Sequence, residues 1–185
     1  MKYLPGETGA DFSDCGLYRY RLWRWWREGP ALVWVGLNPS TADGDTDDPT
    51  IRRVADFSER AGFGGLMMVN LFALRATDPK VLLTTPHPLT TNASVDVLEA
   101  EIKAGAAMCG ARFRARDGSI QAVNGMVVAA WGSQPQILRQ MSGVTAAVKV
   151  WAGGNLRCLG TTKDGSPRHP LYLPKSAEFV PWPVK

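Results

Sequence analysis

Two short segments, far apart in the sequence, carry polar side chains that could belong to one site. The first, Gly36–Thr41 (GLNPST), directly follows the apolar run Ala31–Val35. The second, Gly165–Leu171 (GSPRHPL), lies near the C-terminus and contains one of only two histidines. Open α/β sheets bind ligands at the carboxyl ends of their strands, where loops form a crevice. The two segments therefore predict a crevice that contains Asn38 and His169.

Two amides and an imidazole are the candidate reactive groups. Asn38 either closes an Asn-Pro turn or holds a water or a ligand at the strand end. Asn70 lies inside the apolar run Met68–Phe72, where a buried amide costs free energy unless its polar atoms find partners. It either bonds loop backbone or recognises a planar heterocycle through its donor and acceptor. His169 is either a solvated loop residue or a group that stabilises a developing oxyanion.

Basic and hydroxyl side chains near these groups are candidates for phosphate binding. Asp48-Pro49 predicts a helix start, and backbone N–H groups at a helix start attract anions. Arg53 follows within that helix and either clamps a phosphate or is a solvated or ion-paired side chain. The residues predicted to contact phosphate are Ser40, Thr41, Arg53, Lys163 and Arg168.

An acidic run occupies the first loop, at Asp43, Asp45, Asp47 and Asp48. Its spacing resembles a calcium loop, but Val54 stands where a bidentate Glu is required. We therefore predict a solvated loop and a helix cap, with no metal site and no cofactor. The alternative is a Mg²⁺ held together with a substrate phosphate. An acidic loop beside the crevice also disfavours a duplex-DNA backbone.

Buried strands alternate with helical segments along the chain. The alternation predicts a three-layer α/β/α sandwich with a central, mostly parallel four-stranded sheet and an N-terminal antiparallel edge strand. The edge strand is Tyr18–Trp26, whose arginines either discourage strand pairing or, with the aromatic residues, bind bases and phosphates. The expected buried strands are 31–37, 66–72, 126–131 and 156–159, with helices at 49–61, 91–108 and 135–141.

Length and composition predict one domain over residues 1–185, with residues 109–125 as a loop or hairpin insertion. The sequence has neither a long apolar run nor a secretory signal, so we expect no membrane association. Three scattered cysteines indicate a reduced, cytoplasmic protein. The net charge of +4 favours a polyanionic partner only weakly.

The whole chain resembles an uncharacterised bacterial and phage family marked by the strings GLNPSTA, DPTIRR, NLF and HPLYL. Its motifs are also similar, in type and order, to those of the uracil-DNA glycosylase superfamily. The matching stretches are Gly36–Ser40, Val69–Phe72, Ala130–Gly132 and His169–Leu171. Within that pattern, Ser40 replaces a second glycine and Leu171 replaces a small residue.

The glycosylase resemblance implies a role for each candidate. Asn38 would position the attacking water, Asn70 would recognise an extruded base, and His169 would stabilise charge on the departing pyrimidine. Pro39 and Phe72 would contact the base.

We therefore expect a nucleobase-recognising protein, with N-glycosidic cleavage of an extruded or modified base as the implied reaction. The alternative is a nucleotide-binding module without glycosylase activity, in phage DNA modification or defence. A third interpretation is an interaction protein on the same scaffold, with a closed crevice around Asn38. A nucleic acid or a nucleotide is the expected partner. The identity of the base, the nature of its carrier and the oligomeric state stay open.

Overall fold

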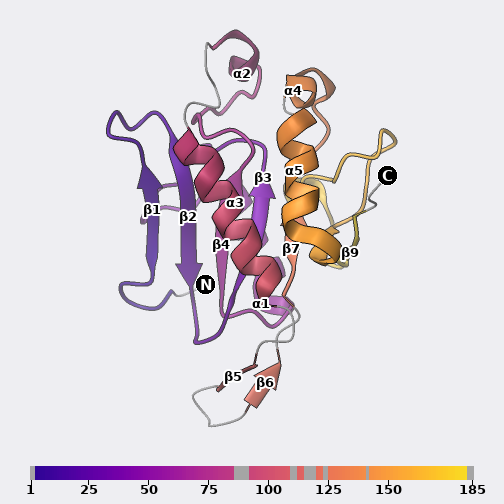
Figure 1. Ribbon diagram of the computed structural model, residues 1–185. Helices are drawn as coiled ribbons and strands as arrows, with labels where there is room; N and C mark the ends of the chain where they lie inside the picture. Colours follow the sequence, from indigo (N-terminus) through magenta and orange to yellow (C-terminus); the bar gives the residue numbers. More distant parts are fainter. Residues whose placement is uncertain are drawn as a thin grey trace.

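The chain forms a mixed α/β structure around one seven-stranded sheet (Figure 1). The computed structural model describes residues 3–85, 92–108, 112–114, 120–122, 125–140 and 142–182. The strands of the sheet are β1 (Thr8–Phe12), β2 (Arg19–Trp25), β3 (Ala31–Gly36), β4 (Gly65–Asn70), β7 (Val127–Ala129), β8 (Leu156–Cys158) and β9 (Val180–Pro181), in the spatial order β1-β2-β4-β3-β7-β8-β9. The pairs β4–β3, β3–β7 and β7–β8 are parallel, and the outer pairs are antiparallel.

Helices connect the parallel strands. They are α1 (Pro49–Arg60), α2 (Val81–Thr84), α3 (Asn92–Ala107), α4 (Pro135–Gln140) and α5 (Ser142–Ala152), followed by the 3₁₀ turns η1 (Gly153–Asn155) and η2 (Pro170–Tyr172). The start of α1 confirms the prediction, because the Asp48 side chain accepts a hydrogen bond from Ile51 N at 2.8 Å. Gly62, with φ of 88°, follows the end of that helix.

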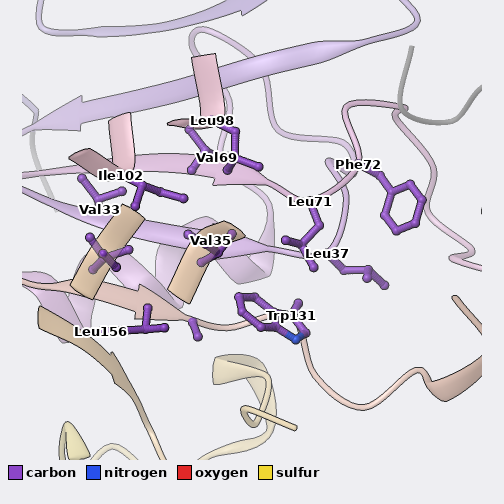
Figure 2. Packing of buried hydrophobic residues seen from close by; sticks show 14 of the residues in the cluster. Val33, Val35, Leu37, Val69, Leu71, Phe72, Leu98, Ile102, Trp131 and Leu156 are labelled. Atoms are coloured by element: carbon purple, nitrogen blue, oxygen red, sulfur yellow. The ribbon is translucent and has the colours of Figure 1, made fainter. Parts of the chain in front are cut away.

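The two faces of β3 pack into two separate hydrophobic clusters. Val33 and Val35 pack in a cluster that includes Leu98 and Ile102 of α3 (Figure 2). Alternate residues of β3 instead join a second cluster with α1, which contains Leu32, Trp34, Ile51, Val54 and Phe57. Helices α3 and α5 lie side by side in front of the sheet in Figure 1. Because β3 is apolar on both faces, it occupies the centre of the sheet.

The predicted edge strand is antiparallel, but it does not lie at the edge. β2 is covered by β1, a strand that the sequence did not predict, and β9 adds a further strand beyond β8. The sheet therefore has seven strands, more than the four central strands and one edge strand that the sequence predicted. The interpretation that the arginines of this strand discourage strand pairing was wrong for Arg19 and Arg24, because both are buried on β2. Both strands that were missed are short, with five and two residues.

The predicted insertion at 109–125 is described only in part. Strands β5 (Arg112–Arg114) and β6 (Ile120–Ala122) form a two-stranded antiparallel sheet of their own, at the bottom of Figure 1. Residues 109–111, 115–119 and 123–124 lie outside the described residues. In the described part of the chain, no helix combines the length and apolar character needed to cross a bilayer.

Candidate functional site

A cleft of about 630 Å³ opens at the carboxyl ends of the parallel strands. From β3 the chain runs through α1 to β4, on one side of β3, whereas from β7 it runs through α4 and α5 to β8, on the other side. The loops that leave these two neighbouring strands therefore diverge, which is the arrangement that creates a ligand crevice in open α/β sheets. The late loop around His169 completes the lining.

Asn70, the last residue of β4, lines the cleft, and its buried amide has no hydrogen-bond partner among the described residues. The residue is only 6% exposed, and neither Nδ2 nor Oδ1 bonds any described residue. A buried polar group left without a partner costs about 1–3 kcal/mol of stability. A ligand with a matching donor and acceptor would supply the bonds that the described residues do not make.

Gly36 leaves room for the Asn70 side chain. The two residues are register partners on β3 and β4. A Cβ atom at Gly36 would lie 2.7 Å from Asn70 Oδ1 and 2.6 Å from Met68 Cε. These separations are shorter than van der Waals contact, so the amide keeps its present position only beside a glycine.

Replacing Gly36 with Ala should therefore displace the Asn70 amide and weaken ligand binding at least about tenfold, about 1.4 kcal/mol. Gly143→Ala is the matched control, because a Cβ there meets nothing within 4 Å. Gly143 lies in α5, where alanine should stabilise the helix by about 0.5–1 kcal/mol. Calorimetric titration of both variants checks the prediction, which fails if Gly36→Ala binds as tightly as Gly143→Ala.

Asn38 lies two residues after the end of β3, and its amide is held in one orientation. Nδ2 donates to the backbone carbonyls of Pro39 at 2.9 Å and Ala76 at 2.7 Å. Both amide hydrogens are thereby used, while Oδ1 accepts no hydrogen bond from the described residues. Asn38 lines the cleft, so it can present a fixed acceptor to a water or a ligand.

His169 lines the cleft and starts the 3₁₀ turn η2. Its Nδ1 accepts a hydrogen bond from Leu171 N at 3.3 Å, which assigns the neutral tautomer with its proton on Nε2. Burial lowers the pKa of His169 below its ordinary value, and the nearby Asp48 only partly opposes this. At neutral pH the ring is therefore uncharged and has one N–H available to donate.

The lowered pKa of His169 predicts a loss of stability in weak acid. Unfolded histidine titrates near 6.5, so below that pH the unfolded chain binds a proton that the folded chain excludes. The stability that the uncharged ring contributes is fully present above pH 6.5. It is lost as the pH falls from there through the lower pKa that His169 has in the folded protein. His169→Gln should reduce the slope of unfolding free energy against pH by up to about 1.4 kcal/mol per unit. Urea titrations between pH 5 and pH 8 measure it, and identical slopes would contradict it.

Two loops at the cleft are tied together by Asp164. Its carboxylate accepts hydrogen bonds from Ser133 Oγ at 2.6 Å, from Thr162 Oγ1, and from Ser166 N at 3.1 Å. These three hydrogen bonds, that from Ser133 first, hold the pKa of Asp164 well below its usual range. This link joins the loop after β7 to the loop that leads to His169.

The predicted phosphate ligands are only partly brought together. Ser40, Thr41 and the exposed Arg168 line the cleft. Arg53 does not, because its guanidinium bonds the Leu173 carbonyl and lies over the Phe57 ring, 5.0 Å from its centroid. Lys163 is exposed on the late loop and is not among the lining residues.

Of the three predicted base contacts, Asn70 lines the cleft, whereas Phe72 and Pro39 do not. Phe72 is completely buried in the hydrophobic core, so it offers no face to a ligand (Figure 2). Pro39 is buried as well and does not line the cleft. The lining aromatic residues are instead Trp131 and Tyr172, and the Tyr172 ring lies 5.6 Å from the His169 ring.

The acidic loop has a structural role. Asp43 accepts hydrogen bonds from the backbone N–H groups of Asp45 and Thr46, and Asp47 pairs with Arg24 at 2.9 Å. Asp48 caps α1. Among the described residues, no cluster of three or more His, Cys, Asp or Glu is arranged to hold a metal ion.

The sequence prediction did not identify Arg19 as part of the site. This arginine is 2% exposed and lines the cleft, and burial lowers its pKa to about 10, so it is cationic at neutral pH. Nη1 donates to the Ala42 carbonyl at 2.9 Å, whereas Nε has no partner among the described residues. The Tyr18–Trp26 pattern contained no signal for this burial, since alternation places Arg19 and Arg21 on the same face.

Comparison with known proteins identifies a family. No curated protein and no solved structure matches the chain significantly. Residues 19–171 match a family model described as a protein of unknown function, DUF1643. The match covers more than half of the chain and includes the loops after β3, β4 and β7 and His169. The chain therefore belongs to the DUF1643 family.

Proposed function

We propose that the cleft binds a nucleobase and that the chain hydrolyses its N-glycosidic bond. The observation that carries the proposal is the buried Asn70 amide at the cleft, whose donor and acceptor both lack partners in the part of the chain that the structure describes. A planar base edge presents an adjacent donor and acceptor, so it would complete both bonds. The cleft volume of about 630 Å³ suits a ligand of nucleoside size.

The remaining polar groups support roles in the hydrolysis. The fixed Oδ1 of Asn38 would accept a hydrogen bond from a water and orient it toward the anomeric carbon. The water oxygen would bond to that carbon as the bond to the base nitrogen breaks. The bonding electrons would leave with the base, which takes up the water's proton. Nε2–H of His169 would donate to the base oxygen where negative charge develops.

Two exposed side chains at the cleft support the proposal that the substrate base is extruded from the base stack of a nucleic acid. Tyr172 is 79% exposed and Leu171 is 38% exposed, and both line the cleft. An exposed aromatic ring offers a stacking surface, and an apolar side chain can fill the space that an extruded base leaves.

The proposal includes a uracil-DNA-glycosylase-like architecture, with three α/β/α layers and a central four-stranded parallel sheet. Its support is the order of the polar positions, with Asn38, Asn70 and His169 on successive loops or strand ends of one cleft. The separate clusters on the two faces of β3 also agree with helices on both sides.

The test is release of free base from oligonucleotides and from nucleosides that contain uracil, hypoxanthine or modified pyrimidines. Chromatography of the released base and alkaline cleavage at the abasic site measure the two products. Wild type should release base, and Asn38→Ala should lower the rate about 100-fold or more. Asn155→Ala is the matched control, because Asn155 bonds the Ala106 carbonyl and does not line the cleft. No release from any substrate would overturn the glycosidase proposal.

A second candidate is a nucleotide-binding module without glycosidase activity, in DNA modification or defence. The small number of cations at the cleft favours this candidate, because Arg168 is the only exposed cation among the described lining residues. Duplex binding relies on many phosphate contacts. Thermal stabilisation by mononucleotides, but not by oligonucleotides, would select this candidate.

A further inference from the structure

Arg19 is a buried cation that the fold leaves incompletely paired. No ion pair among the described residues includes Arg19, although the guanidinium is almost fully buried. Arg24, on the same strand, shows how a buried arginine is satisfied. It pairs with Asp47 at 2.9 Å and donates to the carbonyls of Trp23 at 2.8 Å and Asp43 at 2.6 Å. A buried charge without such partners is destabilising.

An irregularity in the sheet places Arg19 at the cleft. Adjacent residues Asp11 and Phe12 of β1 pair with Arg21 and Arg19 of β2, so Tyr20 is an extra residue in the ladder. Arg21 bonds Glu101 of α3 at 2.7 Å, whereas Arg19 bonds the Ala42 carbonyl in the loop after β3. Without the bulge, the side chains of Arg19 and Arg21, two positions apart, would point to the same face of the sheet. Bulges of this kind redirect side chains and are common beside functional sites.

The other charges at the cleft leave Arg19 available to a ligand. Asp48 is the only acidic residue among the described lining residues; its charge acts on Arg19 from nearby, but its side chain caps α1 and forms no ion pair with Arg19 in the described part of the chain. Thr50 and Ile51 bring the amino end of α1 to the same cleft, and a helix N-terminus also favours an anion.

We propose that Arg19 is an anion subsite of this cleft, and that the ligand carries a phosphate or a carboxylate on the part that enters it. Nε of Arg19, which bonds none of the described residues, supplies a donor, and a bound anion would neutralise the guanidinium charge. The inference extends the proposed function and rests on it for the base part of the ligand. It assigns the substrate to anionic nucleotides or to bases that bear a carboxylate.

Calorimetric titration with matched neutral and anionic probes tests the subsite. The phosphate pairs are uridine with uridine 5′-monophosphate and inosine with inosine 5′-monophosphate. The carboxylate pair is uracil with uracil 6-carboxylate. Wild type should bind the anionic member of at least one pair at least tenfold more tightly, and the pair that responds identifies the source of the anion.

Arg19→Gln should reduce that preference below twofold, and Arg19→Lys should keep part of it if the Gln variant does not fold. Arg21→Gln is the matched control, because it removes the same charge from the same strand on the side of Glu101 and should leave the preference unchanged. Equal affinity within every pair, including no measurable binding, would overturn the subsite. A preference that survives in Arg19→Gln would also overturn it. Base release without an anion preference would overturn the subsite alone, whereas an anion preference without base release would overturn only the glycosidase proposal.

Discussion

Replacing Asn70 with Leu should abolish base binding while leaving the folded protein as stable as wild type or more stable. The amide is buried and has no partner among the described residues, so its removal ends a desolvation cost of about 1–3 kcal/mol. Leucine has a similar volume and adds apolar contact beside Met68. At the same time, the donor and acceptor for the base disappear, and we expect at least a 100-fold loss of affinity, about 2.7 kcal/mol.

Asn155→Leu is the matched control for that prediction. Asn155 Nδ2 donates to the Ala106 carbonyl at 3.0 Å, so the same substitution there breaks a bond and should cost about 1 kcal/mol. Base binding should not change, because Asn155 does not line the cleft. Urea denaturation gives the free energy of unfolding of each variant, and calorimetric titration gives its affinity for the base. If Asn70→Leu destabilises the chain as much as the control and still binds base, the binding role of Asn70 is wrong.

Replacing Arg24 with Met should destabilise the fold by about 3–5 kcal/mol. The Arg24 side chain is 0% exposed and joins β2 to the loop after β3 through Asp47 and the Asp43 carbonyl. Loss of the guanidinium would leave the mostly buried Asp47 carboxylate without its cation. The substitution should also lower activity, because this loop carries Asn38 and leads to α1.

Arg21→Met is the control for the Arg24 prediction. Arg21 pairs with Asp11 and Glu101, but its side chain is 38% exposed, so the loss should stay below about 1 kcal/mol. Urea denaturation at neutral pH measures both changes. Equal losses in the two variants would show that the buried pair with Asp47 does not hold the loop.

The central strands and the order of the polar positions could be predicted because their signals are local. β3 is apolar on both faces, and Asp48-Pro49 starts α1 where the pattern indicated. Asn38 and Asn70 follow from the same patterns, since each lies at the end of a buried parallel strand. Such positions depend on a few neighbouring residues, and the parallel arrangement then brings them to one edge.

The features that were missed depend on contacts between distant residues. The bulge at Tyr20 is a feature of the pairing of β1 with β2, and it changes the face toward which Arg19 points. Phe72 was expected to contact a ligand from the family resemblance, and Arg53 from its place near the start of a helix. The structure places Phe72 in the core and Arg53 over Phe57, because neighbouring elements cover both positions. Sequence patterns thus identified candidates, and tertiary packing decided among them.

The most direct measurement is nuclear magnetic resonance of the side-chain amide groups during titration with a nucleobase or a nucleoside. The Asn70 resonance pair, assigned by its absence in Asn70→Leu, should shift strongly because its hydrogens gain an acceptor. The Asn155 pair should stay in place, since its bond to Ala106 does not change. An Asn70 signal that does not respond to any base, while other residues show binding, would contradict the account.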